Sequence, residues 1–219
     1  MATPLEMTLV YASGAVVPYL IGSVPFGFLI GKMKGLDIRT QGSGNIGATN
    51  VTRVIGKNWG KLCFLLDLMK GILPVVLVSL LVRRGTFDDP CGILPAIAAL
   101  ATVCGHIYPV YLHFKGGKGV VCGISLIFMI DWRMAAVVVG VFVVVIALKR
   151  IMSLASICGA VAFPVSALIF YFGQWDVFAY AAVMSGFVIW LHRDNIKRLM
   201  TGTELPIGAK KKSGKGSAT

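Results

Sequence analysis

Long runs without a charged residue constrain this chain more than any other feature of its sequence. Met7–Gly31 and Ile151–Trp175 each contain 25 residues with no Asp, Glu, Lys or Arg. About 20 mostly apolar residues are enough to cross the hydrocarbon core of a bilayer as an α-helix. Only 14% of the whole sequence is charged, against roughly a quarter in an ordinary soluble domain. The sequence therefore predicts an all-α, polytopic helical membrane protein.

About seven segments are candidate transmembrane helices, and two of them are short. A helix over 119–130 would extend only about 18 Å against a hydrocarbon core of about 30 Å, and 134–148 is little longer. These two are expected to be either short tilted helices or a re-entrant hairpin. The full set is 7–31, 62–82, 91–112, 119–130, 134–148, 151–175 and 177–191.

The first segment is expected to be a retained transmembrane helix and not a signal peptide. A signal peptide starts with a basic region and has an apolar region of about 7–15 residues. The leader here contains Glu6 and no lysine or arginine, and the apolar run that follows is longer.

The distribution of basic residues predicts the orientation in the membrane. Lysine and arginine collect in cytoplasmic loops. Placing the N-terminus outside puts most of the 21 basic residues, which give the chain a net charge of +12, on the inner side. We therefore expect the N-terminus outside and the C-terminus in the cytoplasm. Residues 1–204 are predicted to form a single membrane domain and 205–219 a basic, disordered tail.

The loop QGSGNIGATNVTRVIGK (41–57) is unusually polar for so apolar a chain. Its glycines allow backbone turns with positive φ that expose consecutive N–H groups, which form anion-binding concavities. Ser43 and Asn45 add neutral hydrogen-bonding groups, and Arg53 adds a planar cation suited to phosphate. The pattern indicates an anion site, with a flexible solvated loop as the alternative.

A second polar segment, KGGKG (115–119), precedes one of the short predicted helices. Gly119 follows Lys118 where a nucleotide-binding P-loop would have Ser or Thr for magnesium, so the P-loop pattern is not met. Two cations and three glycines at a helix start suit a phosphate group without implying nucleotide hydrolysis.

Ionisable residues also occur within and at the ends of the predicted spans. Asp67 and Lys70 share one helix face, and either Lys70 reaches a site or the two charges neutralise each other. His106 is as well explained by a structural role as by a catalytic one. His192 and Asn195 are three residues apart, so on a helix they share a face that could orient a hydroxyl or a phosphate. The five cysteines are expected to be small packing residues.

Three motifs, GSGNIGATNVTR, GHIYPVYLHFKGGKG and HRDNIKRLMTGTE, occur in this order and on the same predicted membrane side. The chain thereby resembles the bacterial acyl-phosphate:glycerol-3-phosphate acyltransferase family (integral membrane, PlsY type). The resemblance extends from about residue 15 to residue 204, and the SLAS (153–156) and DLMKG (67–71) segments also fit it. The HxxxxD pair of many other glycerolipid acyltransferases is missing.

The resemblance implies a reaction and a set of residues. An acyl chain would pass from acyl phosphate to the sn-1 hydroxyl of glycerol 3-phosphate, giving lysophosphatidic acid and inorganic phosphate, without acyl-CoA or acyl carrier protein. The catalytic residues would be Ser43, Arg53, Lys118, His192 and Asn195. Substrate-binding positions would be Gly44, Asn45, Gly47, Thr49, Asn50, Lys70, His106, Lys115, Gly116, Gly117, Gly119 and Ser153. Glu204 would be structural and pair with an arginine of its own loop.

The expected partners are the two substrates and the lipid bilayer. A functional link to the soluble enzyme that makes acyl phosphate is implied, and no cofactor, metal or nucleic acid is expected. The location would be the bacterial inner membrane, with the active site on the cytoplasmic side. Which loop holds which phosphate, and whether His192 or the donor phosphate takes the hydroxyl proton, stay open. The alternative function is a transporter or flippase for a phosphorylated solute, although such proteins usually show internal repeats and midplane polar sites.

Overall fold

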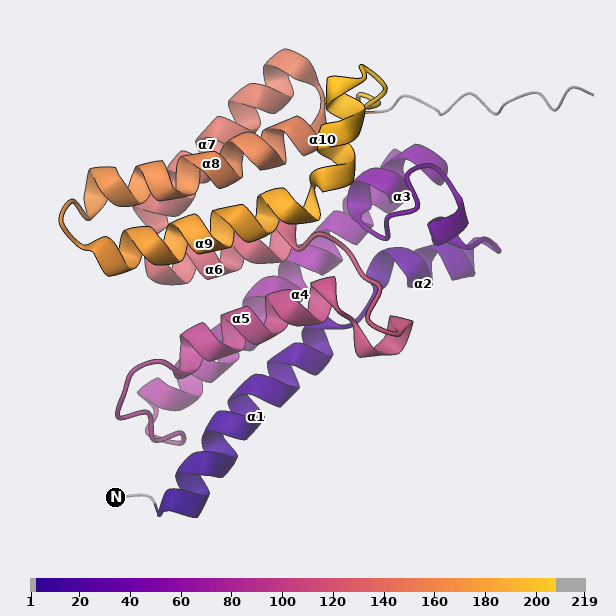
Figure 1. Cartoon of the computed structure of the whole chain (residues 1–219). Helices are drawn as coiled ribbons and strands as arrows, with labels where there is room; N and C mark the ends of the chain where they lie inside the picture. The colour runs from indigo at the N-terminus through magenta and orange to yellow at the C-terminus, as the bar shows by residue number, and fades with distance from the viewer. Residues whose placement is uncertain (1–2, 208–219) are drawn as a thin grey trace, which may run out of the picture.

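The computed structural model describes residues 3–207, and within that range every regular element is a helix (Figure 1). The predicted all-α architecture is confirmed. The α-helices are α1 (Pro4–Gly22), α2 (Phe26–Met33), α3 (Ala48–Val54), α4 (Lys57–Arg83), α5 (Leu94–Ile107), α6 (Val120–Ile130), α7 (Trp132–Lys149), α8 (Met152–Phe170), α9 (Trp175–Leu191) and α10 (Arg193–Met200). Two short 3₁₀ helices are η1 (Ile38–Thr40) and η2 (Val110–Leu112). The predicted tail over 205–219 lies outside the described residues from position 208 onward.

Within residues 3–207, five helical segments are long and apolar enough to cross a membrane, and a sixth is added if α9 and α10, bent by 63° to each other, count as one span. α6 has 11 residues and is too short to be counted. α7 has 18 residues, more than the 134–148 expected, and is one of the five. The total of about seven spans therefore stays a prediction.

The expected span over 7–31 corresponds to one candidate span, Pro4–Met33, within which the chain breaks between α1 and α2. Pro25 lacks an N–H and disfavours helical geometry at the residue before it. At this break, the carbonyl of Val24 accepts hydrogen bonds from the Phe26 N–H at 3.2 Å and from Lys70 Nζ at 2.7 Å. Similarly, α8 ends at Phe170 instead of reaching 175, because a turn containing Gly173 at φ +86° follows it.

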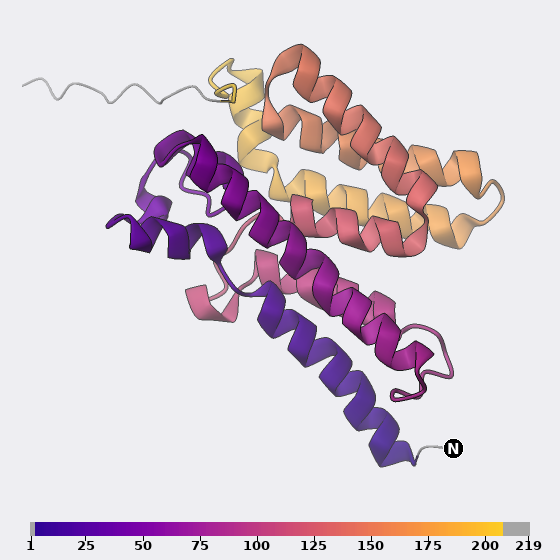
Figure 2. The same ribbon diagram turned by 180° about the vertical axis from the view of Figure 1, so that it is seen from behind.

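The long helices, together with the short α6, form two groups that meet along α4, α5 and α6. One group contains α1, α4 and α5, and the other contains α6 to α9 (Figures 1 and 2). Glycines allow close approach in the first group. A Cβ atom at Gly22 of α1 would overlap the backbone of Thr102 in α5, and one at Gly105 would overlap the backbone of Tyr19. Small residues at such contacts are typical of helices packed in lipid.

Between Leu62 and Leu80, the exposed surface of α4 is apolar, as a lipid-facing helix requires. Its exposed large side chains are Leu62, Phe64, Leu65, Met69, Ile72, Leu73, Val76, Leu77 and Leu80. In water, an apolar surface of this extent would be exceptional for a monomeric protein. The membrane assignment therefore agrees with both the helix lengths and the surface.

The polar motifs gather at one end of the molecule. α2, α3 and α10 lie at this end together with the starts of α6 and α8, while the N-terminus lies at the opposite end (Figures 1 and 2). Three segments far apart in sequence thus become neighbours around one region.

Candidate active site

The loop before α3 is organised by a buried amide. Asn50 Oδ1 accepts the N–H of Ser43 at 2.8 Å, and Asn50 Nδ2 donates to the carbonyls of Ile38, Gln41 and Asn45. The side chain of Asn50, only 1% exposed, is therefore occupied by the loop itself. We assign it a structural role in place of the substrate contact expected from the sequence.

Glycines in this loop have the backbone role that the sequence suggested. Gly42 and Gly44 have φ of +58° and +74°, a region that side chains disfavour. Asn45 Oδ1 accepts the N–H of Gly47 at 2.7 Å, directly before α3 begins. The turn sets the direction of α3, and this helix carries Thr49 and Arg53.

Arg53 points into a confined polar region. Its Nε atom is buried and has no hydrogen-bond partner within residues 3–207. Burial lowers the pKa of Arg53 from its ordinary value, the carboxylate of Glu204 opposes this shift, and the cation of Arg198 adds to it. Arg53 of α3 is thus brought close to two residues of the C-terminal motif, and one of its N–H groups is left for a ligand.

Glu204 links three parts of the site. Its Oε1 accepts hydrogen bonds from Ser153 Oγ at 2.7 Å and Asn195 Nδ2 at 2.6 Å, and its Oε2 accepts one from Arg198 Nε at 2.5 Å. Burial raises the pKa of Glu204, but the bonds from Ser153, Arg198 and Asn195 outweigh this and lower it overall. The predicted pairing of Glu204 with an arginine of its own loop is confirmed.

Asn195 and His192 each retain one unused polar atom. With Nδ2 bonded to Glu204, Asn195 Oδ1 is buried without a partner in the described part of the chain. His192 is 2% exposed, and its Nδ1 lies 2.8 Å from the carbonyl of Val188. Because a carbonyl only accepts, Nδ1 carries the proton, which leaves Nε2 of the neutral ring as an acceptor.

Lys118 approaches the same cluster from the segment before α6. Burial, together with the cation of Arg198, lowers the pKa of Lys118 to about 8, while Glu204 and Asp194 act in the opposite direction. Gly119, at φ +68°, then turns the chain into α6. The prediction that KGGKG ends at a helix start is confirmed.

Gly116 and Gly117 of KGGKG have a different role from the phosphate binding expected from the sequence. The N–H groups of Gly116 and Gly117 donate to the carbonyls of Ile107 and His106 at 3.1 and 3.0 Å. A Cβ atom at either position would overlap the end of α5. Both residues shape the segment by packing closely, and their amides are not free to bind an anion.

Other sequence candidates lie at different depths. Ser43, Gly44 and Lys115 are exposed at the rim, and Ser43 uses its amide for Asn50. Lys70 and His106 are buried below the site, where Lys70 Nζ lies 2.9 Å from Asp67 Oδ1. Of the two roles considered for Lys70, the structure therefore shows the ion pair. Arg198 was not singled out from the sequence, although it lies in the third motif beside Asn195.

The cluster carries an excess of positive charge. Lys118 has Arg193, Arg198, Asp194 and Glu204 as its charged neighbours, and Arg53 shares two of them. Arg193 and Asp194 are exposed, so three cationic side chains, those of Arg53, Lys118 and Arg198, lie around the single carboxylate of Glu204. Such an arrangement, with an arginine N–H unpaired, favours the binding of an anion such as phosphate.

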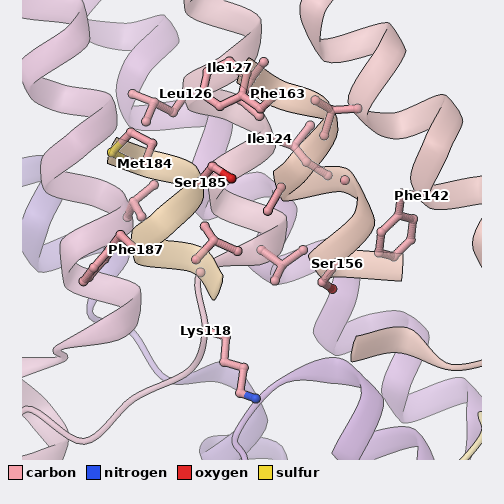
Figure 3. Close-up of a pocket in the computed structure, with 18 of the residues that line it drawn as sticks. Lys118, Ile124, Leu126, Ile127, Phe142, Ser156, Phe163, Met184, Ser185 and Phe187 are labelled. Atoms are coloured by element: carbon pink, nitrogen blue, oxygen red, sulfur yellow. The ribbon is translucent and has the colours of Figure 1, made fainter. Parts of the chain in front are cut away.

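An apolar cavity, partly open to the surroundings, extends from Lys118 between α6, α7, α8 and α9. Figure 3 shows Lys118 at one end with its amine directed away from the apolar side chains, and Leu126, Ile127 and Phe163 at the other end. Among the side chains that the structure describes, the polar ones lining this cavity are those of Lys118, Ser156 and Ser185. The cavity suits a hydrocarbon chain whose polar head lies at Lys118.

Taken together, the fold and the site define a class of protein. This is a polytopic helical membrane protein with a cationic, hydrogen-bonding site at one end and an apolar cavity leading from that site. An enzyme whose substrates combine a phosphate group with a hydrocarbon chain requires both features. The sequence model of the family described as "Glycerol-3-phosphate acyltransferase" matches residues 12–202. The chain belongs to this family, and it is an integral membrane acyltransferase.

Individual relatives agree over nearly their whole lengths. A glycerol-3-phosphate acyltransferase of Thermosynechococcus vestitus is 39% identical over 200 residues, covering 89% of this chain and 94% of the relative. One from Synechococcus sp. (strain CC9902) is 44% identical over 196 residues, with the same two coverages. One from Aquifex aeolicus is 41% identical over 189 residues, covering 85% and 93%.

Two solved structures are similar. Both are of PlsY (YgiH), an integral membrane glycerol 3-phosphate acyltransferase, in a glycerol 3-phosphate form and a lysophosphatidic acid form. The TM-scores are 0.77 and 0.73, each at 37% identity and over 90% of this chain, with 96% and 94% of those chains covered. The family resemblance inferred from three motifs is confirmed, and the transporter alternative is not supported.

Proposed function

We propose that this protein transfers an acyl chain from acyl phosphate to the sn-1 hydroxyl of glycerol 3-phosphate at the cytoplasmic face of a bacterial inner membrane. The products are 1-acylglycerol 3-phosphate and inorganic phosphate. The observation that carries the proposal is the junction of a cationic cluster, with Arg53 Nε and Asn195 Oδ1 unpaired, and an apolar cavity with Lys118 at one end. Both substrates carry a phosphate, and the donor also carries a long apolar tail.

Each part of the junction then has a task. Arg53, with its unpaired N–H, binds the phosphate of glycerol 3-phosphate. Lys118 binds the donor phosphate, and the acyl chain occupies the cavity beyond it. Asn195 Oδ1, a buried acceptor, receives a hydrogen bond from a substrate hydroxyl. Glu204 holds Asn195 and Ser153 in place and does not touch the substrate.

The reaction needs little acid or base strength from the protein. The sn-1 oxygen attacks the acyl carbon, the bond from that carbon to the phosphate oxygen breaks, and phosphate leaves with the bonding electrons. Since an acyl phosphate is a mixed anhydride, its leaving group is already good. The hydroxyl proton passes to the departing phosphate, while the cations stabilise the charge that develops. His192 Nε2 is the competing proton acceptor.

Replacing His192 distinguishes the two acceptors. If His192 only forms a hydrogen bond, His192→Ala should lower turnover about fivefold, since such a bond contributes about 1 kcal/mol. A general base contributes typically 10²–10⁴-fold. A loss of several orders of magnitude in a folded variant would therefore assign the proton to His192.

The overall reaction is tested by incubating the purified protein with a long-chain acyl phosphate and glycerol 3-phosphate. Phosphate release should depend on both substrates, and the product should be acylated at the sn-1 position. Acyl-CoA and acyl carrier protein serve as comparison donors. Activity with either of these in place of acyl phosphate would overturn the proposed donor. An acyl-phosphate donor would also link this enzyme functionally to the soluble enzyme that makes it.

The proposed orientation can be tested with a natural thiol. Cys91 is exposed in the connection between α4 and α5, which lies at the end opposite the site (Figure 1). A membrane-impermeant thiol reagent should label Cys91 in right-side-out vesicles and not in inverted ones, with Cys91→Ser as the control. The reverse pattern would place the site outside the cytoplasm.

A further inference from the structure

A buried polar cluster lies directly beneath the site. Lys70 and Asp67 of α4 form an ion pair of 2.9 Å in which both side chains are almost completely buried. Lys70 Nζ also donates to the carbonyl of Val24 and lies 5.5 Å from the centre of the Phe26 ring. Its N–H groups are therefore directed at partners within the protein, and Lys70 cannot serve as a phosphate ligand in this arrangement.

The cluster continues from α4 to the segment that carries Lys118. His106 Nδ1 lies 3.7 Å from Asp67 Oδ1. The opposite side of the ring packs against Gly117 so closely that a Cβ atom there would overlap Nε2. The carbonyl of His106 also accepts the Gly117 N–H at 3.0 Å. The His106 ring thus fills the space between the Asp67 carboxylate and the residue before Lys118.

The start of α6 is tied to the same point. Cys122 Sγ lies 3.4 Å from the carbonyl of Asp67 and 3.6 Å from His106 Nδ1. Lys118 is consequently held from two sides, by Gly117 before it and by the first turn of α6 after it. Both supports rest on Asp67 and His106.

We propose that Asp67, Lys70 and His106 form one positioning unit that places Lys118 against the reacting phosphate, without touching the substrate themselves. The proposal rests on the function proposed above. A displacement of about 1 Å at a catalytic group can cost on the order of 100-fold in rate, so even a small shift of Lys118 would be measurable. A buried ion pair often adds little to the stability of a fold. Positioning Lys118 would explain why the Asp67–Lys70 pair is buried here.

Two variants disturb the unit while limiting damage to the fold. His106→Phe removes both ring nitrogens and widens the ring against Gly117. The double variant Asp67→Asn/Lys70→Met removes both charges at similar volume, because removing one partner alone would leave an uncompensated buried charge. Thr102→Val is the matched control, since Thr102 is equally buried in α5 and bonds only to Ala98 of its own helix.

The first readout is a double-mutant cycle with Lys118→Arg, which keeps the charge. In the parent protein, His106→Phe should lower kcat by about 10- to 100-fold and change the KM for glycerol 3-phosphate less than threefold. In the Lys118→Arg background the same substitution should have a clearly smaller effect. Thr102→Val should change neither value. The proposal would be overturned if His106→Phe lowered kcat by the same factor in both backgrounds, or if His106→Phe kept full activity in the parent protein.

The second readout does not depend on activity. The amides of Gly116 and Gly117 are hydrogen-bonded to α5, so hydrogen exchange over 115–119 reports the position of this segment. Both disturbing variants should increase exchange there and leave α8 unchanged. Unchanged protection over 115–119 would contradict the positioning role. If instead the parent protein made no acylglycerol phosphate, the proposed function would fail and the exchange result would still stand.

Discussion

Two polar clusters at opposite ends of this molecule use similar side chains with opposite results. The outer cluster consists of Asp131, Arg133 and Tyr171, where Arg133 donates to both carboxylate oxygens of Asp131 and Tyr171 donates to Oδ2. The site cluster consists of Arg53, Lys118, Asn195, Arg198 and Glu204. In the outer cluster one cation meets one carboxylate and the Arg133 guanidinium also stacks on Phe170. In the site cluster cations outnumber carboxylates, and two buried polar atoms have no partner among residues 3–207.

The presence of unpaired buried polar atoms distinguishes a functional cluster from a structural one better than the types of residue do. Buried polar atoms are almost always hydrogen-bonded, so each exception asks for an explanation. At the outer end all the hydrogen bonds join α6, α7 and the start of the turn after α8, and they stabilise that junction. At the site, a phosphate and a hydroxyl from the substrates would supply the missing partners.

The strongest test compares the two arginines. Arg53→Ala should raise the KM for glycerol 3-phosphate by about 100-fold, because two charge-assisted hydrogen bonds of about 1.5 kcal/mol each would be lost. Arg133→Ala should leave the steady-state kinetics unchanged. Initial rates over a range of glycerol 3-phosphate concentrations measure both. A parent-like KM for Arg53→Ala would remove this residue from the acceptor site.

The pH dependence of the site cluster should follow Lys118. Its pKa of about 8 means that the free enzyme loses this positive charge above pH 8, so kcat/KM for the donor should fall up to tenfold per pH unit. Because folding lowers this pKa, the protonated group disfavours the folded state at low pH, and this cost disappears as the pH rises. Stability and activity should therefore change in opposite directions.

Lys118→Arg provides the control for that profile. An arginine keeps its charge over the whole accessible range, so the decline above pH 8 should vanish even if the rate is lower. Rates between pH 6 and 9.5, corrected for spontaneous hydrolysis of acyl phosphate, test this. An identical decline in Lys118→Arg would assign it to another group.

A third test fills the cavity that distinguishes the site from the outer end. A Cβ atom at Gly123 meets no other atom within 4 Å, and Gly123 lines the cavity. Gly123→Leu should therefore occupy space needed by the acyl chain. Displacing about two methylene groups, at about 0.8 kcal/mol each, lowers kcat/KM for a long-chain donor about tenfold.

Gly186→Leu is the matched control, because Gly186 has equally open space but is exposed and does not line the cavity. It should leave the rates unchanged. A short-chain acyl phosphate should be less sensitive to Gly123→Leu than a long-chain one. Equal effects on both donors would show that the chain lies elsewhere.

The smallest effect is expected at the outer cluster. Tyr171→Phe removes the 2.9 Å hydrogen bond to Asp131, which should lower the stability by about 1 kcal/mol without changing kcat or KM. Thermal unfolding in detergent, with parallel activity assays, measures both. A loss of activity at parent-like stability would mean that the outer end also takes part in turnover.

The sequence predicted much of the site because its motifs lie in chemically distinctive loops. The sequence identified Arg53, Lys118, His192 and Asn195 as site residues. The structure brings Arg53, Lys118 and Asn195 together around Glu204 and Arg198, with His192 beside them. Their individual roles remain proposals. Asn50, Gly116 and Gly117 were also recognised, but their part is to form the backbone around the site. A single sequence does not separate these two uses, since an amide or a glycine suits both.

The sequence by itself determined that this is a helical membrane protein. Only helices and closed barrels satisfy the backbone in a bilayer, and the long uncharged runs far exceed the roughly 10 residues of a barrel strand. It also determined which loops are polar and, through the positive charges, their expected side. Only the tertiary structure decided that Glu204 joins Ser153 to Asn195, that Lys70 is enclosed with Asp67, and that a cavity leads away from Lys118. These features depend on contacts between helices distant in sequence, and hydrophobic periodicity along one helix carries no information about its neighbours.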